Sequence, residues 1–421
     1  MKARFSLKVF IFFAVSLSLA HAGALDGIAG GLKNLRAQTP PAAQSKITND
    51  FPTGYPRFAF SDETKIDSLL IDAIGKTNST LDLALFGITL DEVANAIVKA
   101  QEKGVKVRVV MNQNHTFGRR TSPQVELLKG KVEMRSLRGT WTYGVMHNKI
   151  SIYDGKMMET GSYNWTVAAT NDNYENVMFT SDKEMVSGYQ NYFDYMWSLA
   201  RPVADGPRGE VAYGSYPTPT QDPQPSISFN SAVLPKYGFS PLGGAEATLL
   251  AAVNASQKTI EIASYSFYSK PLVEALIAAH ERGVAVHVVT DKTMAVKSGL
   301  TTRMVKAGIK LKWMKGRSGK GAMHNKFAVF DGKLMESGSH NWTSNAEMND
   351  FENFYVCADA DYVGAFAKKF SQLFALAKVP AENELPADNV TPVPPAPIPT
   401  PPAGTKGFAD FSAEPPSVLY E

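Results

Sequence analysis

The sequence has a single cysteine, Cys357, among its 421 residues. An intramolecular disulfide is therefore impossible, and a small disulfide-stabilised scaffold is excluded. Because Cys357 lies in the apolar run 354–358, we expect a buried small side chain and not a reactive thiol. Hydrophobic residues make up 44% of the chain, which excludes a mostly disordered protein and predicts a sizeable core.

The chain also lacks a glycine-rich phosphate loop and any group of histidine, cysteine and aspartate with metal-ligand spacing. After the first 22 residues it has no apolar run long enough to span a membrane. We therefore predict no metal site and no cofactor.

Residues 1–22 have the pattern of a secretory signal peptide. Lys2 and Arg4 precede the apolar run 9–20, and Ala-His-Ala at 20–22 provides a small-x-small cleavage site. The run is short for a membrane anchor. We expect cleavage after residue 22 and an exported protein, either periplasmic or secreted.

The net charge of +3 comes from this segment. Residues 1–22 contain three basic residues and no acidic one, so the remaining chain has 43 − 3 = 40 basic and 40 acidic residues. A chain without net charge has no global field to steer it toward a polyanion, although it can still form a local basic pocket.

A block of 21 residues occurs twice. Residues 146–166 read MHNKISIYDGKMMETGSYNWT and residues 323–343 read MHNKFAVFDGKLMESGSHNWT, and 14 of the 21 positions are identical. Matching segments precede the two blocks: 80–86 with 259–265, and 102–110 with 281–289. Internal similarity of this length indicates a duplicated module.

Helix and strand patterns alternate within each copy. In the first, helical spacing over 66–74 is followed by a strand pattern at 81–86, and a helix over 92–103 by a strand at 105–111. Segments 149–153 and 156–159 predict a hairpin around Asp154. Such alternation predicts an α/β fold with sheets covered by helices.

Composition sets the expected domain boundaries. Six prolines lie between 202 and 225, and 11 lie between 380 and 421. We expect a signal peptide (1–22), a loose leader (23–57), a first repeat (58–200), a Pro-rich linker (201–237), a second repeat (238–378) and a Pro-rich tail (379–421). Prolines with little to bury predict that the tail is extended and disordered.

Both copies carry the same polar residues at the same spacing. They are His147, Lys149, Asp154, Gly161, Ser162, Asn164 and Glu175 in the first copy, and His324, Lys326, Asp331, Gly338, Ser339, Asn341 and Glu352 in the second. On a strand, histidine and lysine two positions apart project from one face, which puts a nucleophile or proton donor beside a cation. Two facing copies would surround a small anion with lysine, asparagine and serine side chains.

Other residues of the block are expected to be structural. Asp154 and Asp331 each precede a glycine in a predicted turn, which favours a turn role. Gly161 and Gly338 would let the backbone approach closely. Trp165 and Trp342 are expected in the core.

The pattern H-x-K-x4-D-x6-G-S-x-N, present twice without a departure, resembles the signature of the phospholipase D superfamily. The wording Gly-Ser-x-Asn-Trp-Thr, followed by Glu-Asn, is most similar to its bacterial endonuclease and mitochondrial cardiolipin hydrolase branch. The resemblance covers roughly residues 58–200 and 238–378. It implies two similar lobes, each a mixed β-sheet flanked by helices, related by pseudo-twofold symmetry with the active site between them. Since relatives with one motif dimerise, a chain with both motifs is expected to be a monomer.

The resemblance also implies a metal-free, two-step hydrolysis of a phosphodiester. By analogy His147 would be the nucleophile that forms a phosphohistidine and His324 the acid, although the residues alone are too symmetric to decide. Each glutamate, Glu175 and Glu352, is expected to accept the second ring N–H of the histidine in its own copy. The expected phosphate-binding residues are Lys149, Lys326, Asn164, Asn341, Ser162 and Ser339.

Two substrates remain open because both use this chemistry. Export, neutral charge and the absence of a basic track favour a phospholipid membrane surface. Residues that could border a lipid-facing site are Trp141, Tyr143, Met157, Met158, Trp313 and Met314. The motif wording favours a nuclease, with DNA or RNA phosphates bound by Arg119, Arg120, Arg135, Arg138, Lys312, Lys315, Arg317 and Lys320. A third class, a non-catalytic binding protein, predicts a damaged motif, and neither copy is damaged.

Overall fold

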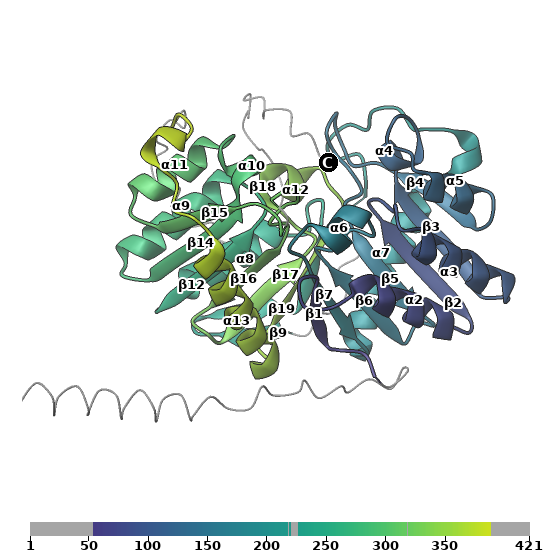
Figure 1. Ribbon diagram of the computed structural model, residues 1–421, viewed down its shortest axis with the longest axis horizontal. Helices are drawn as coiled ribbons and strands as arrows, with labels where there is room; N and C mark the ends of the chain where they lie inside the picture. Colours follow the sequence, from purple (N-terminus) through teal and green to yellow (C-terminus); the bar gives the residue numbers. More distant parts are fainter. Residues whose placement is uncertain (1–53, 218, 220–225, 318, 389–421) are drawn as a thin grey trace, which may run out of the picture. The chain divides into compact units, whose positions relative to one another are not determined.

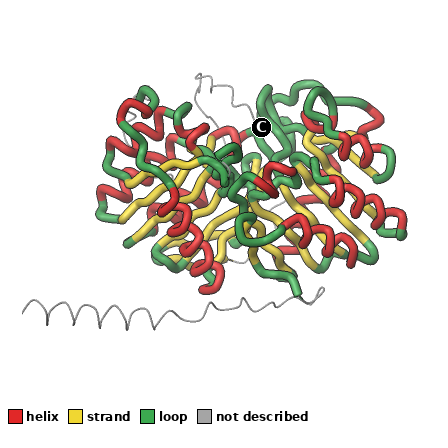
Figure 2. The backbone as a smooth tube through the Cα atoms, in the orientation of Figure 1, coloured by secondary structure: helices red, strands yellow, loops and turns green. Residues whose placement is uncertain are grey.

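The computed structural model describes residues 54–217, 219, 226–317 and 319–388. The predicted signal peptide lies outside the described residues, as do residues 23–53 of the predicted leader and 389–421 of the predicted tail. The described chain forms two mixed β-sheets with helices, one in each half of the sequence (Figures 1 and 2). The predicted α/β fold with two similar lobes is thus confirmed.

The first lobe is built around an eight-stranded sheet. Its strands are β1 (Phe58–Phe60), β2 (Thr80–Leu85), β3 (Lys106–Asn112), β4 (Glu133–Leu137), β5 (Lys149–Tyr153), β6 (Met157–Gly161), β7 (Asn176–Thr180) and β8 (Arg201–Pro202). Its helices are α2 (Ile66–Lys76), α3 (Asp91–Glu102), α4 (Gln113–Thr116), α5 (Pro123–Lys129), α6 (Val167–Asn171) and α7 (Lys183–Leu199). The strand order is β1-β7-β6-β5-β2-β3-β4-β8, in which β2, β3 and β4 are parallel.

The second lobe repeats this plan. Its main strands are β11 (Tyr237–Ser240), β12 (Thr259–Ser264), β14 (Ala285–Asp291), β15 (Lys310–Met314), β16 (Lys326–Phe330), β17 (Leu334–Gly338) and β19 (Glu352–Cys357). A short pair, β13 (Phe267–Tyr268) and β18 (Trp342–Thr343), stands apart from that sheet. Its helices are α8 (Ala245–Ala255), α9 (Lys270–Glu281), α10 (Lys292–Ala295), α11 (Gly299–Lys306), α12 (Ser344–Met348) and α13 (Ala360–Leu376). The order β11-β19-β17-β16-β12-β14-β15 matches the first sheet strand for strand, apart from β8.

Three hydrophobic clusters hold the described residues together. One lies inside each lobe, and these two clusters contain the fully buried Trp165 and Trp342 respectively, as predicted. The third joins the lobes: Tyr189 and Phe193 of α7 belong to the same cluster as Phe366 of α13. The lobes therefore share a core.

A tight turn closes the hairpin of each repeat. Asp154 and Asp331 adopt φ angles of 53° and 54°. The Asp154 carboxylate accepts the backbone N–H groups of residues 78–80 at 3.0, 2.6 and 3.0 Å. Asp331 does the same for residues 257–259. These contacts agree with the predicted turn role and fasten each hairpin to the start of β2 or β12.

The predicted linker and tail contain more structure than expected. Within 201–237 the chain forms a 3₁₀ turn, η1 (Val203–Asp205), and the hairpin β9 (Ser226–Phe229) and β10 (Ala232–Pro235). Burial of Phe229 and Leu234 in the second lobe's core explains this hairpin. In the tail, η2 (Glu382–Glu384) forms, and Thr302 donates a hydrogen bond to the carbonyl of Pro386. The expectation of a linker is thus wrong for 226–235, and the expected disorder of the tail is wrong for 379–388. Cys357 is half-buried.

Across the described ranges, no helix combines the length and the apolar character needed to cross a bilayer.

Candidate active site

Both histidines lie at the edge of a sheet where its parallel strands end. Lys149, at the start of β5, pairs with Leu85, the last residue of β2, and Lys326 pairs with Ser264 at the end of β12. Each histidine lies two residues before its lysine, so the duplicated topology places both at equivalent edges. His147 and His324 are almost fully buried, with 2% and 10% of their side chains exposed.

The glutamates pair with the histidines across the two lobes. His147 Nδ1 lies 2.7 Å from Glu352 Oε1, and His324 Nδ1 lies 2.9 Å from both carboxylate oxygens of Glu175. Our expectation that each glutamate serves the histidine of its own copy is therefore wrong. The backbone explains the exchange: His147 N donates to Phe351 O and His324 N donates to Tyr174 O, so each motif lies beside the residue preceding the other copy's glutamate.

This crossed pairing brings both halves into one site. The pKa of His147 is well below its usual value, first because of burial and then because of the charges of Lys149, Lys326 and His324. Burial also lowers the pKa of His324, although Glu175 opposes it. The two imidazoles thus share one electrostatic environment, as the duplicated motif predicted.

The serines hold the glutamates and do not face a free anion. Ser162 Oγ donates to Glu175 Oε2 at 2.6 Å, and Ser339 Oγ donates to Glu352 Oε2 at 2.5 Å. A hydroxyl has one proton to donate, so neither serine can also donate to a phosphate oxygen in this arrangement. The predicted phosphate-binding role of Ser162 and Ser339 is therefore replaced by a role in positioning the carboxylates.

The asparagines of the motif remain candidates for phosphate binding. The side-chain oxygens of Asn164 and Asn341 are buried and accept no hydrogen bond within the described residues. An amide without a fixed partner can direct its N–H groups toward an incoming anion. Gly161 and Gly338 permit the tight backbone here, since a Cβ atom would lie 2.2 Å from Asn176 O or 2.4 Å from Asn353 O.

The two lysines are buried cations. Lys149 Nζ donates to His147 O at 2.6 Å and Lys326 Nζ donates to His324 O at 2.7 Å, which leaves each ammonium two further N–H donors. Burial is the main reason why the pKa of Lys149 falls to about 7 and that of Lys326 to about 8. A bound anion would favour the charged form of both.

Four asparagines for which no role was predicted connect the lobes. Asn353 Nδ2 donates to Asn148 Oδ1, and Asn176 Nδ2 donates to Asn325 Oδ1, both at 2.8 Å. Thr160 and Ser337 complete the two networks by donating to Asn353 and Asn176. The available signal was the repetition of His-Asn-Lys and Glu-Asn in both copies.

The half-sites differ at the neighbours of their glutamates. Asn173 Nδ2 donates to Glu175 Oε1 at 3.0 Å, whereas the equivalent residue before Glu352 is Asp350, which cannot donate when ionised. Burial would raise the pKa of Glu175, but His324, Lys326 and Ser162 lower it overall. Burial raises the pKa of Glu352 to about 7, against the effect of Lys149. Glu175 is thus the better partner for a charged imidazole.

Several of the predicted phosphate-binding cations already have partners. Arg135, Arg138, Lys312 and Arg317 donate to the backbone carbonyls of Trp197, Trp141, Phe374 and Ser61. The other four predicted cations are exposed: Arg119, Arg120, Lys315 and Lys320. Of the residues proposed to border a lipid, Met157, Met158 and Trp313 are buried, Met314 is half-buried, and Trp141 and Tyr143 are exposed.

Comparison with known proteins gives relatives that match about a third of the chain. The chain is 33% identical over 134 residues to a mitochondrial cardiolipin hydrolase of Chlamydomonas reinhardtii, a match that covers 31% of this chain and 57% of the relative. It is 32% identical over 126 residues to a phospholipase D of Rickettsia prowazekii (strain Madrid E), covering 30% and 59% respectively. The chain thus spans less than two thirds of the length of these curated relatives.

A solved structure shares the two-lobed fold. The phosphatidylserine synthase of Haemophilus influenzae Rd KW20 aligns over 78% of this chain and 89% of its own, with a TM-score of 0.58 and 13% identity. At this identity the likeness concerns the fold alone.

A family model described as "Cardiolipin synthase, PLD-like domain" matches residues 70–197 and 249–374, which together make up more than half of the chain. Each matched segment contains one complete set of histidine, lysine, asparagine and glutamate. The chain therefore belongs to this PLD-like domain family of the phospholipase D superfamily.

Proposed function

We propose that this protein is an exported phosphodiesterase that hydrolyses the headgroup phosphodiester of membrane phospholipids through a phosphohistidine, without a metal ion. One observation carries the proposal: each motif histidine is held by the glutamate of the other lobe, and its backbone carbonyl accepts a hydrogen bond from a buried lysine. Two oriented imidazoles and two cations around one point suit attack on phosphorus followed by hydrolysis.

The reaction takes two balanced steps. In the first, a ring nitrogen of His147 attacks phosphorus, the bond from phosphorus to the headgroup oxygen breaks, and the proton on His324 passes to that oxygen. In the second, water attacks phosphorus while His324 takes up its proton, and the phosphorus–nitrogen bond breaks. The products are an alcohol and a phosphomonoester.

The asymmetry of the half-sites supports this division of roles. A nucleophile must be neutral, and burial together with Lys149 lowers the pKa of His147 strongly. An acid must carry a proton, and the ionised Glu175, fixed by Asn173 and Ser162, stabilises that form of His324.

Lys149 and Lys326 provide the positive charge that the phosphorane needs. Each carries uncommitted N–H donors inside a buried site, where removal of one preorganised donor costs about 3 kcal/mol of transition-state stabilisation. The two lysines can stabilise the negative charge on the phosphate oxygens, which a metal ion does in other phosphodiesterases. We therefore propose that the reaction needs no metal ion.

Two observations favour a lipid over a nucleic acid. The relatives at 32–33% identity are named cardiolipin hydrolase and phospholipase D. Four of the eight cations that would have bound nucleic-acid phosphates are engaged by backbone carbonyls. A nuclease of the same superfamily remains the alternative, and its chemistry at phosphorus would be identical.

A direct assay separates the two substrates. The protein is incubated with vesicles of phosphatidylcholine, phosphatidylglycerol or cardiolipin, and in parallel with single- and double-stranded DNA and RNA. We expect phosphomonoester lipid and free headgroup from at least one lipid, and no nucleic-acid cleavage. His147→Ala and His324→Ala are the controls for contaminating activity. Cleavage of nucleic acid with intact lipids would transfer the proposal to the alternative.

The mechanism has its own tests. Mass spectrometry of protein denatured at neutral pH during turnover should locate the lipid phosphoryl group on His147, and a chelator should leave the rate unchanged. A phosphoryl group on His324 would reverse the assigned roles, and a strict requirement for a divalent ion would refute metal independence.

Export is tested by fractionation. The mature protein should begin at Gly23 and be found outside the cytoplasm, because residues 1–22 resemble a cleavable signal. An uncleaved N-terminus in the cytoplasmic fraction would refute this part of the proposal.

A further inference from the structure

Two equivalent loops lead directly into the histidine motifs. The first, 138–145, ends two residues before His147, and the second, described at 315–317 and 319–322, ends two residues before His324. Both have glycines at matching places, and the first glycine of each loop packs on the opposite lobe. A Cβ atom at Gly139 would lie 2.1 Å from Asn349 O, and one at Gly316 would lie 2.3 Å from Asp172 O.

These loops have one scaffold but different surfaces. The first loop exposes 53% of Trp141 and 47% of Tyr143, although large aromatic side chains usually pack away from water. The second loop has no aromatic residue and exposes Lys315 and Lys320. The duplicated frame therefore carries exposed rings in the loop before one histidine and exposed lysines in the loop before the other.

The exposed ring of Trp141 is held in a strained backbone. Its φ angle is 54°, in the left-handed region that bulky side chains rarely adopt. The neighbouring loop fixes this conformation, because Trp141 N donates to Val211 O at 2.5 Å and Thr142 donates to Glu210. Strain that the surroundings maintain for an exposed side chain indicates a function for that side chain.

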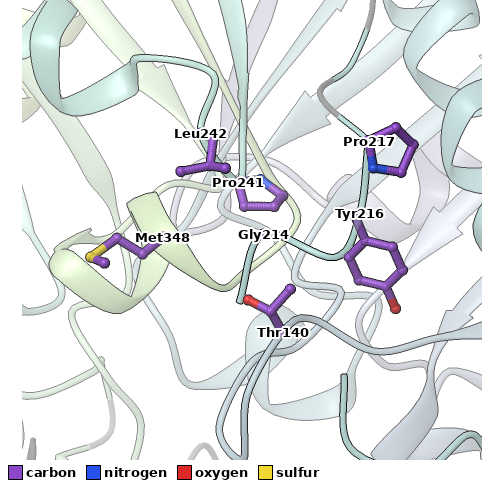
Figure 3. Close-up of a pocket in the computed structure, with 7 residues that line it drawn as sticks. All are labelled: Thr140, Gly214, Tyr216, Pro217, Pro241, Leu242 and Met348. Atoms are coloured by element: carbon purple, nitrogen blue, oxygen red, sulfur yellow. The ribbon is translucent and has the colours of Figure 1, made fainter. Parts of the chain in front are cut away.

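The apolar surface continues past the loop. Thr140, Gly214, Tyr216, Pro217, Pro241, Leu242 and Met348 line a small pocket (Figure 3). Leu242 of this pocket exposes 43% of its surface, and Tyr213, which precedes Gly214 in the chain, exposes 50%. We call Trp141, Tyr143, Tyr213 and Leu242 the ring patch. A cluster of exposed apolar side chains marks a surface made for a partner.

We propose that the ring patch, with Lys315 and Lys320, docks the protein on the surface of an anionic phospholipid bilayer. Tryptophan and tyrosine favour the boundary between headgroups and acyl chains, where one end of the side chain is apolar and the other wet. Lysines beside the second histidine would bind the anionic headgroups. This inference rests on the proposed function, since it names the surface from which the substrate enters.

The cations distinguish a bilayer from single-stranded nucleic acid. A base-stacking platform needs free cations beside its rings to follow the phosphates. Arg138, which adjoins the ring patch, instead donates to the carbonyl of Trp141. The exposed lysines, Lys315 and Lys320, lie in the loop of the second lobe, whereas the exposed rings lie in the loop of the first. This separation suits a broad anionic surface such as a bilayer.

Sedimentation with vesicles tests the docking surface. Binding is measured in the His147→Ala background, so that turnover cannot alter the membrane. We expect Trp141→Ala/Tyr143→Ala to weaken binding to cardiolipin-containing vesicles by about tenfold or more. Val233→Ala is the control, because Val233 is an exposed apolar residue away from the ring patch. It lies on the β9–β10 hairpin, whose turn residue Asn230 donates to Asp331 at the end of the strands opposite to the histidines.

The lysines are tested by lipid charge. Lys315→Ala/Lys320→Ala should weaken binding to cardiolipin vesicles by about fivefold or more at low salt and leave phosphatidylcholine vesicles unaffected. Lys258→Ala/Lys333→Ala, two exposed lysines flanking the Asp331 turn, is the charge-matched control. An equal loss in both pairs would mean that net charge, and not this surface, attracts the membrane.

Activity on two substrates separates docking from folding and from catalysis. With His147 restored, the ring variant should lose turnover of vesicles but keep turnover of a soluble phosphodiester such as bis-p-nitrophenyl phosphate. Ring-dependent vesicle binding without any lipid hydrolysis would uphold docking and refute the proposed function. Unchanged vesicle binding, or a loss of oligonucleotide binding in its place, would overturn the docking proposal.

Discussion

Glu175 and Glu352 each act on a histidine of the other repeat. The partners stand 149 and 205 positions apart in sequence, yet their atoms meet at 2.9 and 2.7 Å. Each carboxylate fixes Nδ1 of its histidine and so leaves Nε2 as the nitrogen directed to the reaction. The chemistry at residue 147 therefore depends on residue 352.

Crossed pairing predicts which step each glutamate supports. With a p-nitrophenyl ester the leaving group needs no acid, so Glu175→Gln, which weakens His324, should retain a rapid burst of p-nitrophenol. Glu352→Gln, which weakens His147, should slow the burst by roughly 10- to 100-fold. Stopped-flow absorbance measures both, with His147→Ala and His324→Ala as reference variants. The reverse pattern would contradict this assignment of the glutamates to the two steps.

The buried lysines predict an alkaline limit to activity. Their pKa values of about 7 and about 8 mean that the free enzyme loses cationic charge as pH rises through this range. We expect kcat/KM to fall there, and kcat to fall at higher pH because bound phosphate favours the ammonium form.

A substitution tests this assignment. Asp291 raises the pKa of Lys326, so Asp291→Asn should move the limb of kcat/KM to lower pH, while Asp205→Asn on the surface should not. A profile that stays flat to about pH 10 would contradict titration of the lysines.

At this scale the sequence identified residue types but not their partners. The histidines, lysines and glutamates were found from their repeated spacing. The crossing was not, because two identical motifs satisfy the same spacing whether they pair within or between copies. The serines were assigned to the phosphate wrongly, because a sequence does not show whether a hydroxyl donates to a phosphate or to a carboxylate.

At the scale of secondary structure, the residues of the candidate active site lie at or next to the ends of strands. The hairpins β5–β6 and β16–β17 begin at Lys149 and Lys326 and turn at Asp154 and Asp331. Each turn therefore helps to position the lysine at the start of its hairpin. Both turns are stabilised by carboxylates that accept backbone N–H groups. Burial alone would raise the pKa of each carboxyl, but these N–H groups lower it overall.

Asp154→Ala should therefore destabilise the protein without changing its chemistry. We expect a loss of about 1–3 kcal/mol in the free energy of unfolding, from lost hydrogen bonds and from alanine at positive φ. Because the folded pKa of Asp154 is depressed, its contribution is present above the unfolded pKa and disappears as pH falls through the folded value. Urea titrations at several pH values measure both effects. A fall in kcat of the folded variant, at unchanged stability, would indicate a catalytic role.

The sequence predicted long elements better than short ones. Apolar spacing located α3 within one residue at each end, since its buried face follows the helical period. Strands β1 and β11 were missed because three or four residues carry no readable period, and their pairing with β7 and β19 depends on distant segments.

At the scale of the two lobes, the described chain is held together by the core shared between α7 and α13 and by the asparagine networks that join the lobes. Neither lobe keeps its inner face covered without the other. We expect residues 54–388 to unfold as one unit.

Calorimetry should show a single thermal transition whose van't Hoff and calorimetric enthalpies agree. Asp154→Ala, in the first lobe, should shift the whole transition and not only part of it. Two separate peaks, with only one displaced, would show that the lobes are thermodynamically independent.

Duplicated segments are ordinarily free to drift, because one copy can cover for the damage of the other. Here the exchange of glutamates removes that freedom, because a substitution of Glu352 impairs the histidine of the first copy and a substitution of Glu175 impairs that of the second. We therefore expect selection to act on both repeats together.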